Sequence, residues 1–399
     1  MRSAVTPTVL VADGEQRSAL ATVRSLGRAG YRVFVASHVR RSLAGDSKYV
    51  TGTVVTPKPL DDPAGFVETI RQHVIHWSVD VLLPVTDASV LALLPERDRI
   101  AAILPFPSAD AFTRLCDKDA VAVEAQTLGI GVPGTTRVES AADAAALDFT
   151  SMTFPVVLKP LRSVQLVNGK RVKRLVAPYR DADSLQAALR GLANEEYPVL
   201  LQERIVGPGV GVFVILHNGE LRAAFAHRRI REKPPWGGVS VLRESIALDR
   251  ELLERSVALL RRFEVEGAAM VEYKIDSRTG QPSIMEINGR LWGSLQLAID
   301  AGVDFPKLIV EAALGIQSAP ALSYRRGVRS RWFWGDVDNL LLQLRARDPE
   351  LANGATRLKC VGDFLRACGP GSRNEVLRFS DPLPAVRETL DWLAALRAN

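Results

Sequence analysis

Apolar runs alternate with amphipathic stretches along the first hundred residues. The strand-like runs are 8–12 (TVLVA), 31–36 (YRVFVA) and 79–84 (VDVLLP), and the helical patterns between them are 17–29 and 63–77. Short apolar strands that alternate with helices are typical of a parallel sheet with both faces covered. We therefore expect a β-α-β unit here, to which 103–105 adds a fourth strand.

The turn after the first of these strands bears on the cofactor. It reads Asp13-Gly14-Glu15-Gln16 and contains one glycine, whereas the dinucleotide-binding fingerprint contains three. The sequence therefore disfavours an NAD site. After the strand 79–84, the run Thr86-Asp87-Ala88-Ser89 lies where the carboxyl edge of a parallel sheet faces ligands, so it either contacts substrate or caps a helix.

From residue 110 onward the pattern mixes helices with antiparallel strands. Asp117 can cap a helix that stops at Gly129, and Asn218-Gly219 is a favoured two-residue hairpin turn. Strands are expected at 156–159, 199–203, 210–217 and 220–227, and a helix at 182–193. The first two strands and the helix predict a small α+β lobe.

These elements predict the α/β class and three parts. Residues 1–109 are expected to form a Rossmann-like domain, and residues 110–320 a domain of two α+β lobes, with a lid lobe at about 154–206. Residues 321–399 are interpreted as a small C-terminal appendage, which contains Trp332 and Trp334 and matches no unit.

Two glutamates occupy facing strands in the second part. The segments 267–275 (GAAMVEYKI) and 282–288 (PSIMEIN) are joined by a turn-rich connection, which predicts an antiparallel hairpin. Because side chains alternate between faces, one face is expected to hold Glu272, Glu286 and Asn288. The opposite, apolar face is expected to hold Val271, Tyr273, Ile275, Met285 and Ile287. Pairing residue 272 with residue 286 brings three oxygen ligands together.

Two carboxylates side by side repel each other by about 4 kcal/mol at ~4 Å and an effective dielectric of roughly 20. A divalent cation removes that cost, and Mg²⁺ prefers oxygen ligands that it shares with water and phosphates. We therefore interpret Glu272, Glu286 and Asn288 as ligands of Mg²⁺, for which Mn²⁺ can substitute. The alternative is a solvated strand face. Arg290, on the same face by period two, would direct a positive charge toward a developing oxyanion.

Composition narrows the class of partner. The 399 residues are 47% hydrophobic and carry a net charge of +6, but the basic residues are scattered without interleaved aromatic side chains. An anionic small molecule such as ATP is thus favoured over nucleic acid. The three cysteines, Cys116, Cys360 and Cys368, match no metal-binding spacing. With no signal peptide and no apolar run long enough to span a bilayer, we expect a cytoplasmic protein with no membrane partner.

The run Glu286-Ile287-Asn288-Gly289-Arg290-Leu291-Trp292-Gly293-Ser294, together with Glu272, resembles the ATP-grasp superfamily, in particular its carbamoyl-phosphate-synthase-like and carboxylate-amine ligase branch. The resemblance covers about residues 110–315, and the β-α-β unit before it is similar to the family's pre-ATP-grasp domain. It implies an ATP-grasp fold with ATP and Mg²⁺ as cofactors.

By position, the resemblance implies a nucleotide site. Lys118 matches the first nucleotide-binding lysine, and Lys159 matches the lid lysine that contacts phosphates. Gln202, Glu203 and Ile205 lie in the segment that resembles the hinge around adenine. The alternatives are surface lysines and a strand that ends in a turn.

The run 227–238 (HRRIREKPPWGG) resembles the basic strand and loop that face the transferred phosphoryl group. Arg229 would stabilise that group, His227 would contact substrate or have a structural role, and Gly237-Gly238 would let the backbone approach a ligand. The stretch 161–174 departs from the family because it has one glycine. Phosphate closure would then use Arg162, Lys173 or Arg174.

The resemblance implies a ligase in which ATP phosphorylates a carboxylate and an amine then displaces phosphate, forming an amide or peptide bond. Arg290, Arg229 and His227 would be catalytic, and small-molecule carboxylates and amines would be the partners. The sequence is also compatible with a homodimer. Two alternatives stay open: an ATP-grasp carboxylase or phosphoryl-transfer enzyme that forms no amide, and a non-catalytic ATP-binding regulator.

Overall fold

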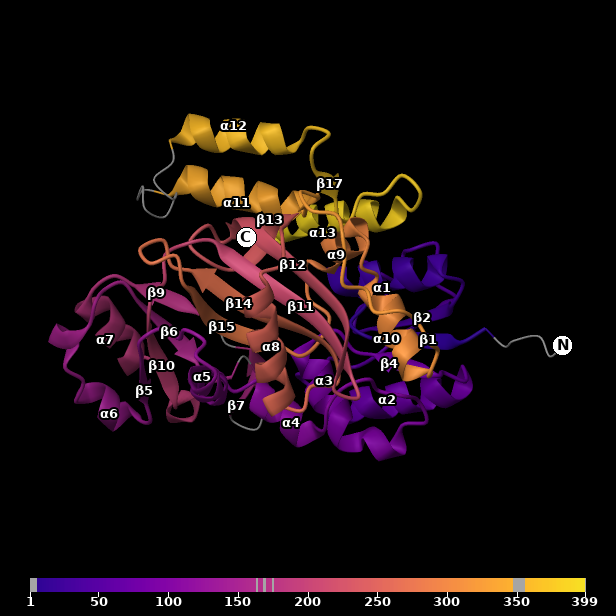
Figure 1. Ribbon diagram of the computed structural model, residues 1–399, viewed down its shortest axis with the longest axis horizontal. Helices are drawn as coiled ribbons and strands as arrows, with labels where there is room; N and C mark the ends of the chain where they lie inside the picture. Colours follow the sequence, from indigo (N-terminus) through magenta and orange to yellow (C-terminus); the bar gives the residue numbers. More distant parts are fainter. Residues whose placement is uncertain (1–5, 163, 168–169, 174–175, 347–355, 399) are drawn as a thin grey trace.

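A four-stranded parallel sheet with the order β3-β2-β1-β4 forms the N-terminal part of the chain in this computed structural model, which describes residues 6–162, 164–167, 170–173, 176–346 and 356–398 (Figure 1). Its elements are β1 (Thr8–Val11), α1 (Arg17–Arg28), β2 (Arg32–Ser37), β3 (Gly52–Val55), α2 (Pro63–His76), β4 (Val81–Leu83) and α3 (Asp87–Leu93). The predicted β-α-β unit is confirmed.

Two details of this sheet differ from the prediction. Residues 103–105 do not form a strand, because Ile103 makes a single bridge to Val81 while Leu104 turns into the core. The fourth strand is instead β3, at the sheet edge, where exposed and half-buried residues alternate. An edge strand covered on one side carries no continuous apolar run, so the pattern of buried parallel strands did not predict it.

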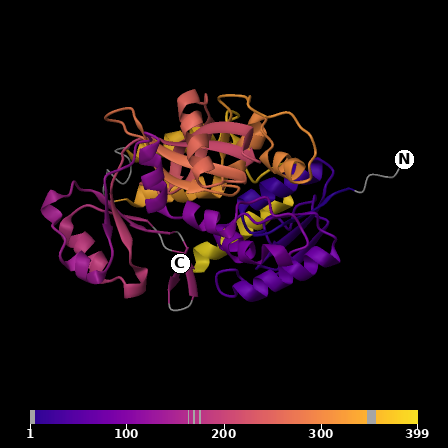
Figure 2. The same cartoon turned by 60° about the horizontal axis from the view of Figure 1, so that its bottom comes forward.

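A smaller antiparallel sheet with the order β5-β10-β6-β9 carries the predicted lobe, which Figure 2 shows at the opposite end of the molecule from the N-terminal sheet. Its elements are β5 (Thr135–Val138), α6 (Ala141–Ala145), β6 (Val156–Pro160), β9 (Ala177–Tyr179), α7 (Ala182–Arg190) and β10 (Val199–Glu203). A separate hairpin joins β7 (Val164–Val167) and β8 (Lys170–Lys173). The helix predicted at 182–193 ends early, where Gly191 caps it.

A seven-stranded sheet with the order β15-β14-β11-β12-β13-β16-β17 forms the centre of the molecule. Its strands are β11 (Gly209–His217), β12 (Glu220–Lys233), β13 (Val239–Ser245), β14 (Gly267–Ile275), β15 (Pro282–Asn288), β16 (Arg329–Arg331) and β17 (Arg373–Asn374). The predicted hairpin around Asn218-Gly219 is confirmed, with positive φ at both residues. Two short strands of the predicted C-terminal appendage thus complete this sheet.

Both faces of the large sheet are covered. On one face Phe213 and Phe225 share a core with the N-terminal sheet, α9 (Leu295–Ala301) and α10 (Phe305–Ala313). On the other, Val212, Val214 and Tyr273 pack against α8 (Arg250–Arg262) and α5 (Lys118–Thr127), and α4 (Ala109–Leu115) precedes α5. Burial on both sides explains why β11 is buried at nearly every residue.

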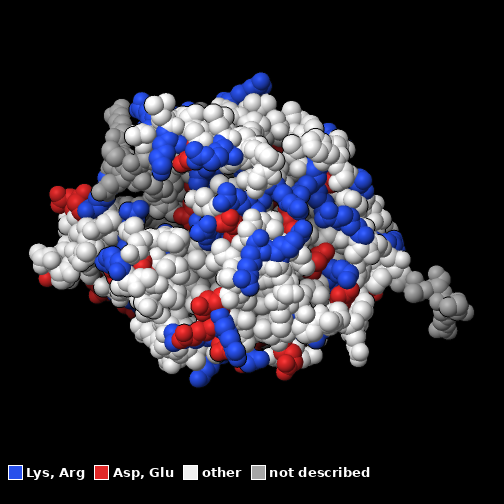
Figure 3. Space-filling view, turned by 45° about the horizontal axis from the view of Figure 1, so that its top comes forward, with Lys and Arg blue, Asp and Glu red and all other residues white. Residues whose placement is uncertain are grey.

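Three helices complete the chain: α11 (Phe333–Arg345), α12 (Arg357–Ala367) and α13 (Leu383–Ala398). Trp334 of α11 stacks on Trp392 of α13 with ring centroids 4.0 Å apart. No helix among the described residues is long and apolar enough to span a membrane. Figure 3 shows Lys and Arg side chains gathered in a band across one face, with carboxylates set among them.

A buried ion pair fastens the C-terminal segment to the first helix. Arg24 of α1 donates from Nε to Asp381 at 2.8 Å, and both residues are buried. Asp381 also accepts hydrogen bonds from Ser47 Oγ at 2.7 Å and from the backbone N–H of Lys48 at 2.9 Å. One carboxylate therefore joins three segments of the chain.

Replacing Asp381 with alanine should lower the free energy of unfolding by about 3 kcal/mol, because the Arg24 guanidinium stays buried without its counter-charge. Chemical denaturation measures the change. Glu254→Ala, which breaks the exposed pair with Arg250 on α8, is the control and should change stability little. Equal effects of the two substitutions would contradict this interpretation.

Candidate active site

The two glutamates face each other as the sequence predicts. Glu272 of β14 is the register partner of Glu286 of β15, and Asn288 follows on the same face. The apolar face differs from the prediction. A β-bulge after Glu272 pairs Tyr273 with Ile284, so Ile284 and not Met285 joins the buried cluster. One extra residue in β15 shifts the alternation of side chains by one position.

A row of register partners extends from this pair across the large sheet. Glu286, Glu272, Gly211 and His227 lie on adjacent strands in that order. Glycines 209 and 211 leave the surface of β11 open, and a Cβ at residue 209 would lie 2.9 Å from Cδ of Arg229. The missing side chains allow the long Arg229 side chain of β12 to cross β11 and bind Glu272.

Arg229 is the central cation of the site. Besides Glu272 it binds Glu232 at 3.0 Å and the carbonyl oxygen of Gly238 at 3.1 Å. The predicted loop glycines thus contribute a backbone acceptor to the arginine. The sequence correctly brings Arg229 to the acidic pair, but β11, which lies between them, carries no polar residue that would have indicated it.

Burial divides the two carboxyl groups electrostatically. It raises the pKa of Glu272 to about 7, which Arg229 opposes and the neighbouring Glu286 reinforces. Burial also acts on Glu286, but Lys118, Asn288 and Lys159 outweigh it and hold the pKa of Glu286 below its usual value. Asn288 donates from Nδ2 to Glu286 at 3.0 Å. The pair therefore depends on cations from several elements.

The two predicted lysines approach the acidic pair from different parts of the chain. Lys118 begins α5 behind its cap Asp117, and it lines a cavity of about 90 Å³ together with Glu286 and Asn288. Lys159 of β6 is buried and donates to Gln202 of β10. Burial lowers the pKa of Lys159 to about 8, and nearby Lys118 adds to this effect while Glu286 opposes it. Both lysines carry their charge toward the same carboxylate.

Arg290 binds a carboxylate that the sequence placed elsewhere. Its Nε and Nη2 donate to the two oxygens of Asp87 at 2.7 and 3.1 Å, and Nη2 also donates to Oδ1 of Asn288 at 3.0 Å. Asp87 opens α3, so the N-terminal sheet contacts the site through this ion pair. Of the run proposed for substrate contact, Thr86 caps α3, as the alternative interpretation expected.

Asp13 holds the turn that presents Asp87. Its carboxylate accepts from the backbone N–H groups of Val85 and Thr86, both at 3.0 Å, and from the Ser89 hydroxyl at 2.5 Å. Burial raises the pKa of Asp13 to about 6, although these hydrogen bonds favour the charged form. Asp13 therefore supports the position of Asp87 without facing the ligands of the site.

His227 is buried and shows the features of a structural residue. Its ring stacks on Phe213 with centroids 4.6 Å apart, and Nε2 lies 3.0 Å from the Ser294 hydroxyl. Burial, assisted by Arg229 and Arg243, lowers the pKa of His227 well below its usual value, so the imidazole is neutral. Its Nδ1 has no hydrogen-bond partner among the described residues. His227 thus orients the loop after Arg290 through Ser294.

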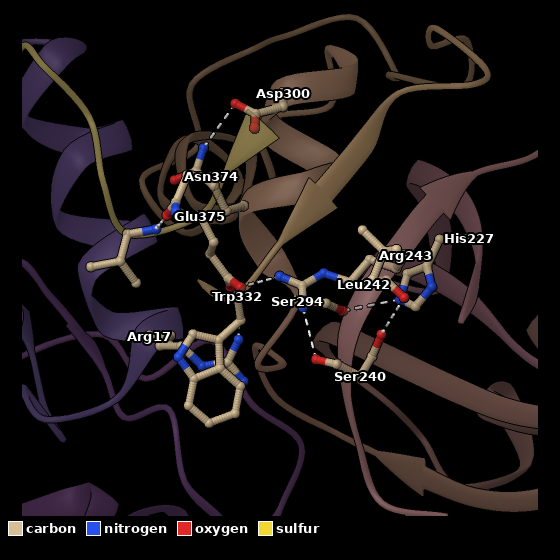
Figure 4. Close-up of polar contacts among 12 residues, drawn as sticks. Arg17, His227, Ser240, Leu242, Arg243, Ser294, Asp300, Trp332, Asn374 and Glu375 are labelled. Carbon is tan, nitrogen blue, oxygen red and sulfur yellow. Dashed lines mark hydrogen bonds and ion pairs between the residues drawn. The ribbon is translucent and has the colours of Figure 1, made fainter. Parts of the chain in front are cut away.

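A second buried ion cluster lies beside His227 (Figure 4). Glu375 accepts from Arg17 at 2.7 Å and from Arg243, and Arg243 donates to the carbonyl oxygen of Ser240 at 2.8 Å. Arg17 also lies over the ring of Trp332 at 3.9 Å. The sequence analysis missed this cluster, because its members come from α1, β13 and the segment after β17 and share no motif.

The predicted hinge residues lie at the end of β10. Gln202 holds Lys159 and donates to Thr135 Oγ1 at 3.1 Å, Glu203 accepts from Arg278 at 2.8 Å, and Ile205 is buried. Arg162 binds Asp117 at 3.2 Å, near the start of α5. The side chain of Lys173 and all of Arg174 lie outside the described residues. The roles of these residues toward ATP stay predictions.

The residues at the acidic pair fit a magnesium ion by their chemistry. Two carboxylates and an amide oxygen are hard donors, and Lys118, Lys159 and Arg229 balance the charge that the metal would otherwise neutralise alone. No group of three or more His, Cys, Asp or Glu side chains in the described part of the chain is arranged to hold a metal. The third ligand would therefore be Asn288, phosphate or water.

Comparison with known proteins identifies the fold. A family model described as "ATP-grasp in the biosynthetic pathway with Ter operon" matches residues 195–334. A search of curated protein sequences found no match. Solved structures of similar fold exist for several enzymes, all at low sequence identity.

The L-amino acid ligase from Bacillus licheniformis superimposes with a TM-score of 0.63 and 16% identity, covering 81% of this chain and 78% of that chain. Biotin carboxylase from Campylobacter jejuni gives 0.62 and 17%, covering 81% and 74%. N5-carboxyaminoimidazole synthetase from Staphylococcus aureus gives 0.61 and 15%, covering 81% and 80%. At these identities the likeness establishes the fold, and the predicted fold class is confirmed.

The pH dependence of stability should report the buried Asp13. Its pKa in the folded protein, about 6, exceeds the usual 3.8, so its contribution is complete below pH ~4 and is lost as pH rises through ~6. Relative to Asp13→Asn, the wild-type free energy of unfolding should fall by roughly 2 kcal/mol between these pH values. Denaturation at a series of pH values tests this, with the exposed substitution Asp391→Asn as control. Parallel curves for wild type and Asp13→Asn would refute it.

Proposed function

Since this chain is a member of the ATP-grasp superfamily, we propose that it is an ADP-forming ligase that joins a carboxylate to an amine. ATP would phosphorylate the carboxylate, and the amine would attack the acyl phosphate and release phosphate. The observation that carries the proposal is the row of Glu286 and Glu272 with Arg229 reaching over β11, next to Asn288 and Arg290. Opposed carboxylates and two arginines suit the transfer of a phosphoryl group.

Each charged residue then has a role that follows from its position. Lys118 and Lys159, from two different sheets of the chain, would bind the phosphates of ATP, with Gln202, Glu203 and Ile205 at the adenine. Glu272, Glu286 and Asn288 would hold Mg²⁺, whose chemistry is to neutralise phosphate oxygens. Arg229 and Arg290 would stabilise charge on the transferred group and on the acyl oxygen.

Ligand binding would exchange partners within the site. Arg229 binds Glu272 and Arg290 binds Asp87, so each catalytic cation is held by a carboxylate in this structure. An arriving phosphate or substrate carboxylate offers the same bidentate acceptor as Asp87. We place substrate between Asp87 and Asn288, since Arg290 spans both residues.

A carboxylase is the second candidate. Two of the three structures compared above are a biotin carboxylase and an N5-carboxyaminoimidazole synthetase, and their fold is that of this chain. The same residues would then activate a different carboxyl donor. We propose a cytoplasmic location for either reaction, because Cys116, Cys360 and Cys368 are all free thiols.

Glu286→Gln should lower the rate of ADP formation at least ~100-fold while leaving the fold intact, because one carboxylate of the pair is lost where phosphoryl charge develops. The assay supplies Mg-ATP with panels of carboxylates and amines and measures phosphate release. Glu254→Gln, an exposed substitution on α8, is the matched control and should keep full activity.

Product analysis distinguishes the candidates. A ligase yields an amide whose formation requires the amine, and hydroxylamine in its place traps the acyl phosphate as a hydroxamate. Incorporation of bicarbonate without an amide would favour the carboxylase. Normal turnover by Glu286→Gln would refute the site, and Mg-ATP binding without turnover over the whole panel would favour a regulator.

A further inference from the structure

Helix α13 exposes a stripe of large apolar side chains. Leu383, Val386, Leu390, Leu393 and Leu396 are 59%, 53%, 52%, 42% and 46% exposed. Their spacing of three or four residues places them along one side of the helix. Apolar stripes of this kind are the seams through which helices pair, and extended apolar patches on a soluble protein mark interaction sites.

The opposite side of α13 is fixed to the rest of the molecule, so the stripe cannot turn inward. Trp392 stacks on Trp334 and donates to Asp338 at 2.9 Å. Glu388 accepts a hydrogen bond from Trp332 at 2.7 Å, and Arg387 binds Asp46 at 3.0 Å. These contacts hold the helix in one rotation about its axis, with the apolar side in solvent.

We propose that the stripe binds a second copy of this chain, with the two α13 helices antiparallel about a two-fold axis near Leu390. The order of the stripe is nearly the same in both directions. Reversal pairs Leu383 with Leu396 of the partner subunit, Val386 with Leu393 of the partner subunit, and Leu390 with Leu390 of the partner subunit. A two-fold interface requires such self-complementarity, because the same surface meets itself.

Charge on the flank of the stripe favours the same arrangement. Arg387 and Asp391 lie one turn apart on one side of α13, 3.5 Å from each other, and Asp391 is 61% exposed. In the antiparallel pair Arg387 lies across from Asp391 of the partner subunit, and the contact occurs twice. In a parallel pair each charge would face its own like, so the charges select the antiparallel orientation.

The apolar surface continues beyond the helix. Phe379, 96% exposed, and Leu377, 44% exposed, precede α13 directly. A stable dimer buries roughly 800 Å² on each partner, more than one helical stripe provides. The stripe would therefore form the centre of the interface, and the segment before α13 would extend it.

Sedimentation equilibrium of the full chain tests the assembly. We expect twice the mass of 43.5 kDa for the wild type. Leu390→Asp places two carboxylates on the two-fold axis and should weaken dimerisation at least 100-fold, with an unchanged circular dichroism spectrum. Leu365→Asp, at an apolar side chain of α12 that is 62% exposed, is the matched control and should leave the dimer intact.

Disulfide trapping tests the orientation, in a chain that carries Cys368→Ser to remove the exposed native thiol. A mixture of Leu383→Cys and Leu396→Cys proteins should form mixed cross-links, whereas each protein alone should not. A monomer up to roughly 0.1 mM would overturn the proposal. So would a dimer that Leu390→Asp leaves unchanged, or cross-links between identical variants only.

Discussion

Two carboxylates, Glu272 and Glu286, are buried side by side in the central sheet, and much of the surrounding structure answers the resulting charge. A buried carboxylate without a counter-charge is costly, and a second one beside it adds roughly 4 kcal/mol of repulsion at an effective dielectric of ~20. The cations that offset this cost come from α5, β6 and β12 as Lys118, Lys159 and Arg229. Elements far apart in sequence thus meet at one point because charge must be balanced there.

The backbone makes this balance sterically feasible. Arg229 reaches Glu272 because β11 presents glycine at residues 209 and 211, in an otherwise apolar strand. The N-terminal sheet contributes through Asp87, which Asp13 holds in place and which binds Arg290. The site therefore combines a rigid sheet surface with cations from the surrounding elements, and this arrangement suits ligands that exchange with internal ion pairs.

Much of the fold could be predicted from local patterns. The hairpin of β14 and β15 follows from alternation, and its turn length alone placed residue 272 opposite residue 286. The bulge that moves Met285 off the apolar face could not be predicted, since a bulge is selected by packing of Tyr273 and Ile284 against α8 rather than by sequence alternation. The cluster of Arg17, Arg243 and Glu375 was equally hidden, because its members are brought together only by the tertiary fold. Residues whose role depends on one strand were found, and residues whose role depends on three segments were not.

The ion pair between Arg24 and Asp381 also constrains how the chain reaches its native state. The two residues are separated by 357 positions, so the guanidinium in the first helix gains its partner only after nearly the whole chain has been synthesised. Until then α1 carries a positive charge on a surface that is buried in the finished protein. The N-terminal sheet can collapse early, but its outer layer is completed last, and a ribosome-bound chain would expose this surface to chaperones throughout elongation.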